Sequence, residues 1–252
     1  MIPQVFHQIW VGPEPVLDGF DKWQESWAHH HPAWEQRLWT DDNLPTDLRN
    51  PQVYERDRHP VERADILRLE LLYRFGGVYL DADLECLKPI DPLIDGLEFF
   101  GMDIKPGRVT NTVIGSVAGH PILDRALAEI TPQEPGVRFD KTKSGPVFLD
   151  GVVKQFPPPT VFPRKTFYPI TPDEHRDAYS IHHCARTWKS LEEWKIEALR
   201  AEARLRKVNE ELEKERRAHL ETKRALAELR RKQTALKGKL RQGEPEPRQG
   251  AD

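Results

Sequence analysis

From Val5 to Cys184, short apolar runs alternate with segments in which apolar residues recur every three or four positions. The short runs, bounded by Gly, Pro or Asp, predict strands. We expect strands at Val5–Trp10, Arg37–Thr40, Val78–Asp81, Glu98–Met102, Thr112–Val117 and Ala178–His183. The periodic segments predict helices at Asp18–His29, Val61–Phe75 and Pro121–Ile130. This alternation predicts an α/β sheet with helices on both faces.

The pattern changes after Trp188 to a seven-residue repeat. One series recurs at Leu191, Ala198, Leu205, Leu212, His219, Leu226, Gln233 and Leu240. A second series lies three residues after each of these, at Trp194, Ala201, Val208, Glu215, Thr222, Leu229 and Leu236. Such heptads predict a long helix that self-associates as a coiled coil. The alternative is a single charged helix supported by ion pairs along its own surface.

Charge divides the chain at the same place. Met1–Trp188 has 28 acidic and 20 basic residues, whereas Lys189–Arg241 has 10 acidic and 17 basic residues. A change in sign at the end of a periodic pattern is typical of a boundary between a domain and an appendage. We therefore expect an α/β domain over residues 1–188, a heptad-repeat helix over 189–241, and a disordered tail rich in Gly, Pro and charge over 242–252.

Other sequence features narrow the class of protein. Cys86 and Cys184 are the two cysteines, too few for a disulfide framework. The first residues have neither the charged nor the apolar region of a secretory signal, and no apolar run approaches the roughly 20 residues of a membrane span. We expect a cytoplasmic protein without a nucleic-acid partner or a transmembrane segment. The basic helix leaves open a peripheral contact with the inner face of a membrane.

Candidate chemistry concentrates between Arg63 and Glu85. On a helix, Asp65 and Arg68 lie on one face because residues three apart are neighbours. Gly76-Gly77 ends that helix and lets the chain reverse into an apolar strand. The strand ends at Asp81 and Asp83, and the carboxyl end of a strand in an open α/β sheet is where ligands usually bind.

Asp81 and Asp83 are separated by one residue, so in an extended chain both side chains point to the same side. Two close carboxylates repel each other unless a positive charge lies between them. A divalent cation supplies that charge, and oxygen ligands suit Mg²⁺ or Mn²⁺. Such an ion also neutralises charge on phosphate oxygens.

The stretch from Ala64 to Asp83 resembles the DXD signature of glycosyltransferase family 32, whose core is similar to that of the large glucosylating toxins. The resemblance continues in Ile2–Gly12 and in His182-His183 followed by Trp188, and spans residues 1–188. It implies a GT-A fold, a Rossmann-like nucleotide-sugar-binding domain, here followed by the C-terminal helix. It also implies a nucleotide-sugar donor, a divalent metal and retention of anomeric configuration.

The resemblance implies a role for several residues. Trp10 would stack on the nucleobase of the donor, the alternative being a core tryptophan. Asp65 and Arg68 would bind the sugar hydroxyls or phosphate, with an exposed ion pair as the alternative. Asp81 would contact the ribose and, through water, the metal, which Asp83 would ligate directly. Asn111 and Ser144 occupy places that the family uses near the reacting sugar, or else serve ordinary turns.

The remaining implied residues lie near the end of the domain. A residue five positions before the tryptophan contacts the metal in the family, which indicates His183 rather than His182. An imidazole ligand favours Mn²⁺ over Mg²⁺. Thr187 and Trp188 would hold the diphosphate. Cys184 and Arg186 depart from the family pattern, in which an aromatic residue and a glycine are usual.

These observations predict a metal-dependent hexosyltransferase that moves a sugar from a UDP- or GDP-sugar to a hydroxyl acceptor such as a polysaccharide or glycolipid. The catalytic set would be Asp65, Arg68, Asp81, Asp83 and Asn111. The C-terminal coiled coil would make such an enzyme a homo-oligomer. One alternative is a coiled-coil scaffold with an inactive transferase-like head. A phosphatase with a D-x-D motif is a weaker alternative, because Leu84-Glu85 follows the motif where that chemistry usually places a Thr.

Overall fold

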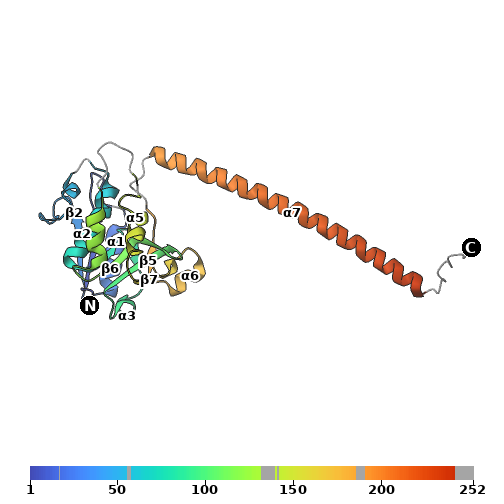
Figure 1. Cartoon of the computed structure of the whole chain (residues 1–252), viewed down its shortest axis with the longest axis horizontal. Coiled ribbons are helices and arrows are strands. Elements are labelled where there is room, and N and C mark those ends of the chain that lie inside the picture. The colour runs from blue at the N-terminus through green and yellow to red at the C-terminus, as the bar shows by residue number, and fades with distance from the viewer. Residues whose placement is uncertain (17, 56–57, 132–139, 141, 186–190, 242–252) are drawn as a thin grey trace, which may run out of the picture. The chain divides into compact units, whose positions relative to one another are not determined.

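The computed structural model describes residues 1–16, 18–55, 58–131, 140, 142–185 and 191–241. The chain separates into two compact units, Met1–Trp188 and Lys189–Asp252. Figure 1 shows the helices and strands of both units. Thr187 and Trp188, the two residues predicted to hold the diphosphate, lie outside the described residues, as does Arg186.

A mixed six-stranded sheet forms the centre of the first unit, in the order β2-β1-β3-β6-β5-β7. Its strands are β1 (Val5–Trp10), β2 (Glu35–Thr40), β3 (Gly77–Leu80), β5 (Phe99–Lys105), β6 (Arg108–Ser116) and β7 (Thr160–Phe162). β1 runs parallel to β2 and β3, and β7 runs parallel to β5, whereas β6 is antiparallel to β3 and β5. A second, antiparallel sheet joins β4 (Leu84–Cys86) to β8 (Ser180–His182). The α/β prediction is confirmed.

Helices cover both faces of this sheet. The helices of this unit are α1 (Phe20–His30), α2 (Pro60–Phe75), α3 (Asp91–Ile94), α4 (Pro121–Glu129), α5 (Pro146–Val153) and α6 (Pro172–Asp177), with short 3-10 turns at Pro51–Tyr54 and Arg164–Thr166. One apolar cluster joins α2, α4 and α5 to side chains such as Ile9 and Ile114. A second cluster joins α1 to Phe6 and Leu80 on the other face. Because side chains alternate along a strand, the sheet supplies both clusters.

The double glycine after α2 allows the chain to turn directly into the sheet. Gly76 and Gly77 both have positive φ angles, of 63° and 99°, which side chains with a Cβ rarely adopt. A Cβ on Gly77 would lie 2.5 Å from the carbonyl oxygen of Val5 and 3.1 Å from Nε2 of His7. Glycine at position 77 therefore allows β3 to begin in close contact with β1. The position of β3 in turn determines where Asp81 lies, four residues after Gly77.

The second unit contains α7 (Leu191–Arg241), one continuous helix of 51 residues. Side chains are described from 202 to 238, and all of them are exposed. Six large apolar side chains on this exposed surface occupy heptad positions: Leu205, Val208, Leu212, Leu226, Leu229 and Leu236. The long helix is confirmed, and the coiled coil stays a prediction. In the described part of the chain, no helix combines the length and apolar character needed to cross a membrane.

Candidate active site

Polar side chains from α2, β6, β8 and the turn after β3 meet at the carboxyl end of β3. Arg68 and Asp65 come from α2, Asn111 comes from β6, and Asp81 directly follows β3. A backbone bond from Leu84 N to Asp81 O closes a turn between β3 and β4, and Asp83 lies within it. β4 pairs with β8, which brings His182 opposite Leu84. Residues separated by a hundred positions in sequence therefore lie together.

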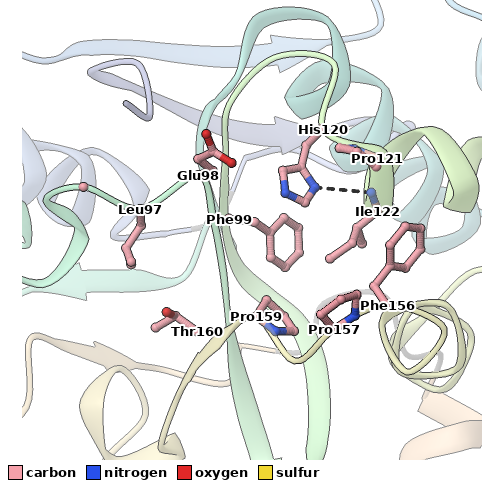
Figure 2. A pocket seen from close by; sticks show the side chains of 11 residues that line it. Leu97, Glu98, Phe99, His120, Pro121, Ile122, Phe156, Pro157, Pro159 and Thr160 are labelled. Carbon is pink, nitrogen blue, oxygen red and sulfur yellow. Dashed lines mark hydrogen bonds between the residues drawn. The ribbon is translucent and has the colours of Figure 1, made fainter.

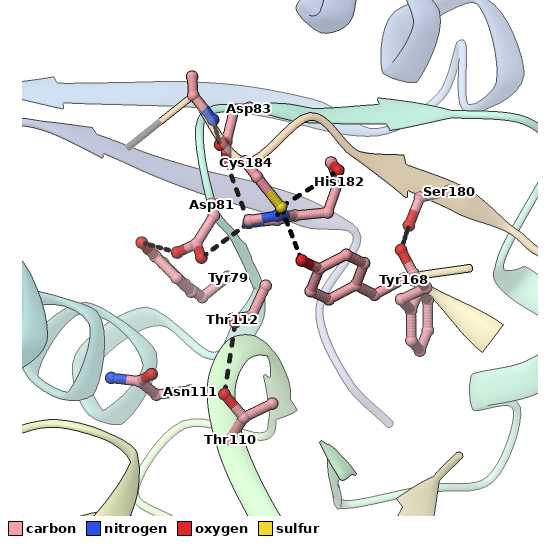
Figure 3. A network of polar contacts seen from close by, with 12 residues as sticks. Tyr79, Asp81, Asp83, Thr110, Asn111, Thr112, Tyr168, Ser180, His182 and Cys184 are labelled. Carbon is pink, nitrogen blue, oxygen red and sulfur yellow. Dashed lines mark hydrogen bonds and ion pairs between the residues drawn. The ribbon is translucent and has the colours of Figure 1, made fainter. Parts of the chain in front are cut away.

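Asp81, Asp83 and His182 form a compact group of metal-ligand type (Figure 3). The Nε2 atom of His182 lies 3.5 Å from Oδ2 of Asp81 and 3.2 Å from Oδ1 of Asp83. One ligand atom from each residue lies within 4.8 Å of the others. The backbone N–H of Ala185 donates to the second oxygen of Asp83 at 2.8 Å, which leaves Oδ1 facing the imidazole. Two carboxylates and one imidazole are a donor set that suits Mn²⁺.

His182 occupies the position that the sequence predicted for His183. His183 is the next residue, so its side chain faces the other way, as alternation along an extended chain requires. Its Nε2 atom is 2.8 Å from Oε2 of Glu85, and its ring stacks on Trp23 with centroids 4.7 Å apart. The backbone N–H of His183 donates to the carbonyl oxygen of Asp83 at 2.9 Å, but its imidazole does not reach the carboxylates of the two aspartates. Counting back from Trp188 indicated His183, whereas the pairing of β8 with β4 turns the imidazole of His182 toward the aspartates.

Arg68 is the positively charged centre of the site, with its side chain 7% exposed. Its guanidinium lies 3.2 Å from Oδ1 of both Asp65 and Asp81, and it donates to the carbonyl oxygen of Asn111 at 2.6 Å. The guanidinium carbon also lies 4.4 Å from the centre of the Tyr79 ring. The exposed ion pair considered as an alternative for Asp65 and Arg68 is therefore wrong, since both side chains are buried among partners.

Asp65 joins the site to α5 and β6. Its Oδ1 accepts from the amide of Asn111 at 2.7 Å, and its Oδ2 accepts from the hydroxyl of Ser144 at 3.2 Å. Asn111 and Ser144 thus belong to the same polar network rather than to isolated turns. Burial raises the pKa of Asp65 to about 6, since the charge of Arg68 and the bonds from Ser144 and Asn111 offset burial only partly.

The pKa values of Asp81, Asp83 and His182 are coupled, because each group carries or faces the charge of the others. Burial opposes ionisation of Asp81, but the hydrogen bond from His182 and the charge of Arg68 outweigh it and lower the pKa of Asp81. Burial raises the pKa of Asp83 despite the nearby His182. For His182, burial lowers the pKa, yet bonding to Asp81 and the charges of both aspartates raise it to about 9. Positive charge is thus favoured between the two carboxylates.

Residues 18–100 match the family model described as "Glycosyltransferase sugar-binding region containing DXD motif". This segment holds Asp65, Arg68 and the Asp81–Asp83 pair. This segment of the chain is therefore similar to the DXD-motif glycosyltransferases. The resemblance to glycosyltransferase family 32 is therefore confirmed.

Several curated relatives of this chain are yeast enzymes. Inositol phosphoceramide mannosyltransferase 3 of Schizosaccharomyces pombe is 34% identical over 160 residues, which is 59% of this chain and 44% of that protein. Mannosyl phosphorylinositol ceramide synthase SUR1 of Saccharomyces cerevisiae is 29% identical over 171 residues, which is 62% of this chain and 43% of that protein. The chain thus spans less than half the length of these relatives.

A solved structure shows the same fold. The structure titled "PaToxG Glycosyltransferase" superposes with a TM-score of 0.51 at 18% identity, covering 61% of this chain and 68% of that chain. At this identity the likeness concerns the fold alone. The predicted GT-A fold followed by a long C-terminal helix is confirmed.

Sequence reasoning missed three residues around the cluster. The hydroxyl of Tyr79 donates to Oδ1 of Asp81 at 2.8 Å. Tyr79 lies two residues before Asp81, so strand alternation was a signal for it. Tyr168 and Cys184 contact His182 from the side away from the aspartates. Tyr168 comes from a loop between β7 and α6, and no local sequence pattern connects that loop to the site.

Trp10 lies at the carboxyl end of β1, beside the strand that leads to Asp81. It is half-buried and absent from both apolar clusters, and its indole N–H donates to the carbonyl oxygen of Glu14 at 2.8 Å. The core position considered as its alternative is therefore not the one observed. Stacking on a nucleobase stays a prediction.

A hollow of about 520 Å³ lies elsewhere on the domain (Figure 2). Its lining includes Phe99, at the start of β5, with His120, Ile122 and Phe156. β5 runs in the same direction as β3, since both are antiparallel to β6. The hollow is therefore at the amino end of these strands, opposite Asp81, and contains none of the predicted site residues.

Proposed function

We propose that this chain is a metal-dependent, retaining hexosyltransferase that transfers a sugar from a nucleotide-sugar donor to a hydroxyl acceptor. The observation that carries the proposal is the convergence of Asp81, Asp83 and His182 within one ligand-sized group beside the buried Arg68. The names of the yeast relatives favour mannose as the sugar and a glycolipid bearing inositol phosphate as the acceptor.

Asp81, Asp83 and His182 would hold a divalent cation, with Mn²⁺ favoured because one ligand is an imidazole. When bound, the cation supplies positive charge that offsets the negative charge of the departing nucleoside diphosphate. Asp83 is oriented for metal binding, because the N–H of Ala185 holds one of its oxygens and leaves the other beside His182.

The donor sugar would lie over Arg68, Asp65 and Asn111. Arg68 is held by Asp81, Asp65 and the Asn111 carbonyl, so its charge cannot move away as negative charge develops. Such fixed groups stabilise a transition state without reorganising during the reaction. Asp65 and Asn111 are hydrogen-bonded to each other, and hydrogen bonds to sugar hydroxyls would replace some of these contacts when the donor binds. Trp10 would stack on the base, and Thr187 and Trp188 would contact the diphosphate.

Donor hydrolysis with added Mn²⁺ tests this proposal. The full-length protein is incubated with GDP-mannose and a panel of other UDP- and GDP-sugars, with and without Mn²⁺, and released nucleoside diphosphate is measured. We expect Mn²⁺-dependent release from one donor, reduced at least about a hundredfold in Asp83→Ala. Asp95→Ala is the matched control, because Asp95 is an exposed aspartate outside the site.

The anomeric configuration of the product, read by NMR, then tests retention. If no nucleotide sugar binds even with Mn²⁺, the enzyme proposal fails. The coiled-coil scaffold with an inactive head would then explain the chain better, because the exposed heptad residues of α7 do not depend on the site.

A further inference from the structure

Two residues outside the metal-ligand group, Cys184 and Tyr168, contact the imidazole of His182 (Figure 3). The thiol Sγ of Cys184 is 3.1 Å from Nδ1 of His182, the ring nitrogen turned away from the aspartates. The hydroxyl of Tyr168 is 2.7 Å from the same sulfur. The Tyr168 ring also lies against the imidazole, with centroids 4.8 Å apart.

These contacts satisfy one consistent pattern of protons. If Nε2 faces a metal or the carboxylates, Nδ1 carries a proton and donates it to Sγ. The Tyr168 hydroxyl donates to the same sulfur, and the thiol S–H donates to the carbonyl oxygen of His182 at 3.6 Å. A ligating histidine usually donates its second N–H to a partner that fixes the ring's orientation. Here that partner is a thiol.

The backbone keeps both partners in place. The N–H of Tyr179 donates to the carbonyl of Thr166 at 2.7 Å, and the hydroxyl of Ser180 donates to the carbonyl of Phe167 at 2.8 Å, so the loop before Tyr168 is bound to the start of β8. Cys184 has a φ of 53°, the positive value of a tight turn. This turn aims the N–H of Ala185 at Asp83 while the thiol faces the imidazole.

We propose that Cys184 and Tyr168 are positioning residues that hold the His182 imidazole toward the metal, which makes metal binding sensitive to modification of the Cys184 thiol. This inference rests on the proposed function, because it assumes that Asp81, Asp83 and His182 bind Mn²⁺. Neither residue belongs to the group that would hold the cation. Each acts through His182.

Substitution of the two residues separates positioning from folding. We expect Cys184→Ala and Tyr168→Phe each to weaken Mn²⁺ binding by about tenfold to a hundredfold, the usual effect of losing such a partner. Binding is measured by electron paramagnetic resonance of free Mn²⁺, without any donor sugar. Cys184→Ser keeps a polar group at the same strained position and should restore affinity to within about threefold of the native protein.

Tyr179→Phe is the control for Tyr168→Phe, since it removes a hydroxyl from the same region with no contact to His182. Thermal unfolding of each variant without Mn²⁺ shows whether the fold is intact. Unchanged Mn²⁺ affinity in a folded Cys184→Ala protein overturns the inference. Equal loss in the Ser and Ala variants does the same.

Alkylation gives a second test that needs no substitution. Cys86 is 3% exposed and burial raises its pKa to about 12, so N-ethylmaleimide should label Cys184 alone in the folded protein. We expect labelling to abolish Mn²⁺ binding and Mn²⁺ to slow labelling. Full Mn²⁺ affinity in the labelled protein overturns the inference. Absence of Mn²⁺ binding by the unlabelled native protein instead counts against the proposed function, so the two failures are distinguishable.

Discussion

At the scale of single residues, His7 shows how burial fixes a protonation state. Its Nε2–H donates to the carbonyl of Gly76 at 2.8 Å, and its Nδ1 accepts from the indole of Trp39 at 3.0 Å. A second proton, on Nδ1, would face the indole N–H of Trp39, so two donors would meet in a fully buried site. Burial, together with the charge of Arg37, lowers the pKa of His7 to about 4, although the Gly76 carbonyl and Glu35 oppose this.

We predict that the contribution of His7 to the free energy of unfolding decreases as the pH falls from about 6.5 to about 4. In this window the unfolded chain binds a proton at His7 and the folded chain does not, so acid favours unfolding. The shift corresponds to roughly 3 kcal/mol in total. Urea unfolding at several pH values measures it. His7→Gln should show a shallower dependence, and an unchanged dependence would contradict the assignment. Asp65, whose raised pKa acts with the opposite sign, is common to both proteins.

Arg68→Lys should lower kcat/KM by about a hundredfold to a thousandfold if the proposed function holds. A lysine carries the same charge but lacks the planar fork that reaches Asp65, Asp81 and the Asn111 carbonyl together. Arg74→Lys is the matched control, since Arg74 is an exposed arginine at the end of the same helix, paired with Asp47. A decrease below about threefold in Arg68→Lys would show that the guanidinium geometry is not required.

The structure brings Asp65, Arg68 and Asp81 together, as expected from sequence, and places the imidazole of His182 rather than that of His183 beside them. Asp65, Arg68 and Asp81 were predictable because helix and strand periods are local rules. The choice between His182 and His183 was not, because it depends on how β8 pairs with a strand one hundred residues earlier. Tyr168 reaches His182 only through tertiary folding, so neighbouring residues give no sign of it.

At the scale of elements, α2 and β3 were predictable almost to the residue. The helix was expected at Val61–Phe75 and is observed at Pro60–Phe75. The register between strands was not predictable, because it depends on contacts such as Gly77 against Val5. The antiparallel direction of β6 was likewise outside what the pattern indicated, since a strand's apolar alternation has no direction.

Gly77→Ala should therefore destabilise the domain by roughly 2–5 kcal/mol, from backbone strain and from overpacking. Gly107→Ala is the matched control, because Gly107 has a φ of 77° but no atom within 4 Å of an added Cβ. Only the Gly77 variant should lose stability from the steric clash with Val5. Chemical denaturation of both variants measures the difference. Equal losses would mean that the positive φ, rather than close approach to β1, selects glycine after α2.

At the scale of the whole molecule, the chain joins a GT-A domain to a helix whose described side chains pack on nothing within its own unit. The exposed leucines of α7 are not scattered. Six of the large apolar residues fall on heptad positions, whereas Leu220 lies off them. A lone solvated helix has no need of an apolar seam, which favours association of two copies.

We therefore predict that the full-length protein forms a dimer through α7, measured by sedimentation equilibrium across a range of concentrations. Leu229→Glu places two carboxylates in the seam and should weaken the dimer at least about tenfold, because unpaired charge replaces an apolar contact. Leu220→Glu adds the same charge to the same helix outside the seam and should leave the dimer intact. A monomeric native protein at all concentrations would favour the single charged helix instead. Equal weakening by both substitutions would mean that net charge, rather than the heptad seam, governs association.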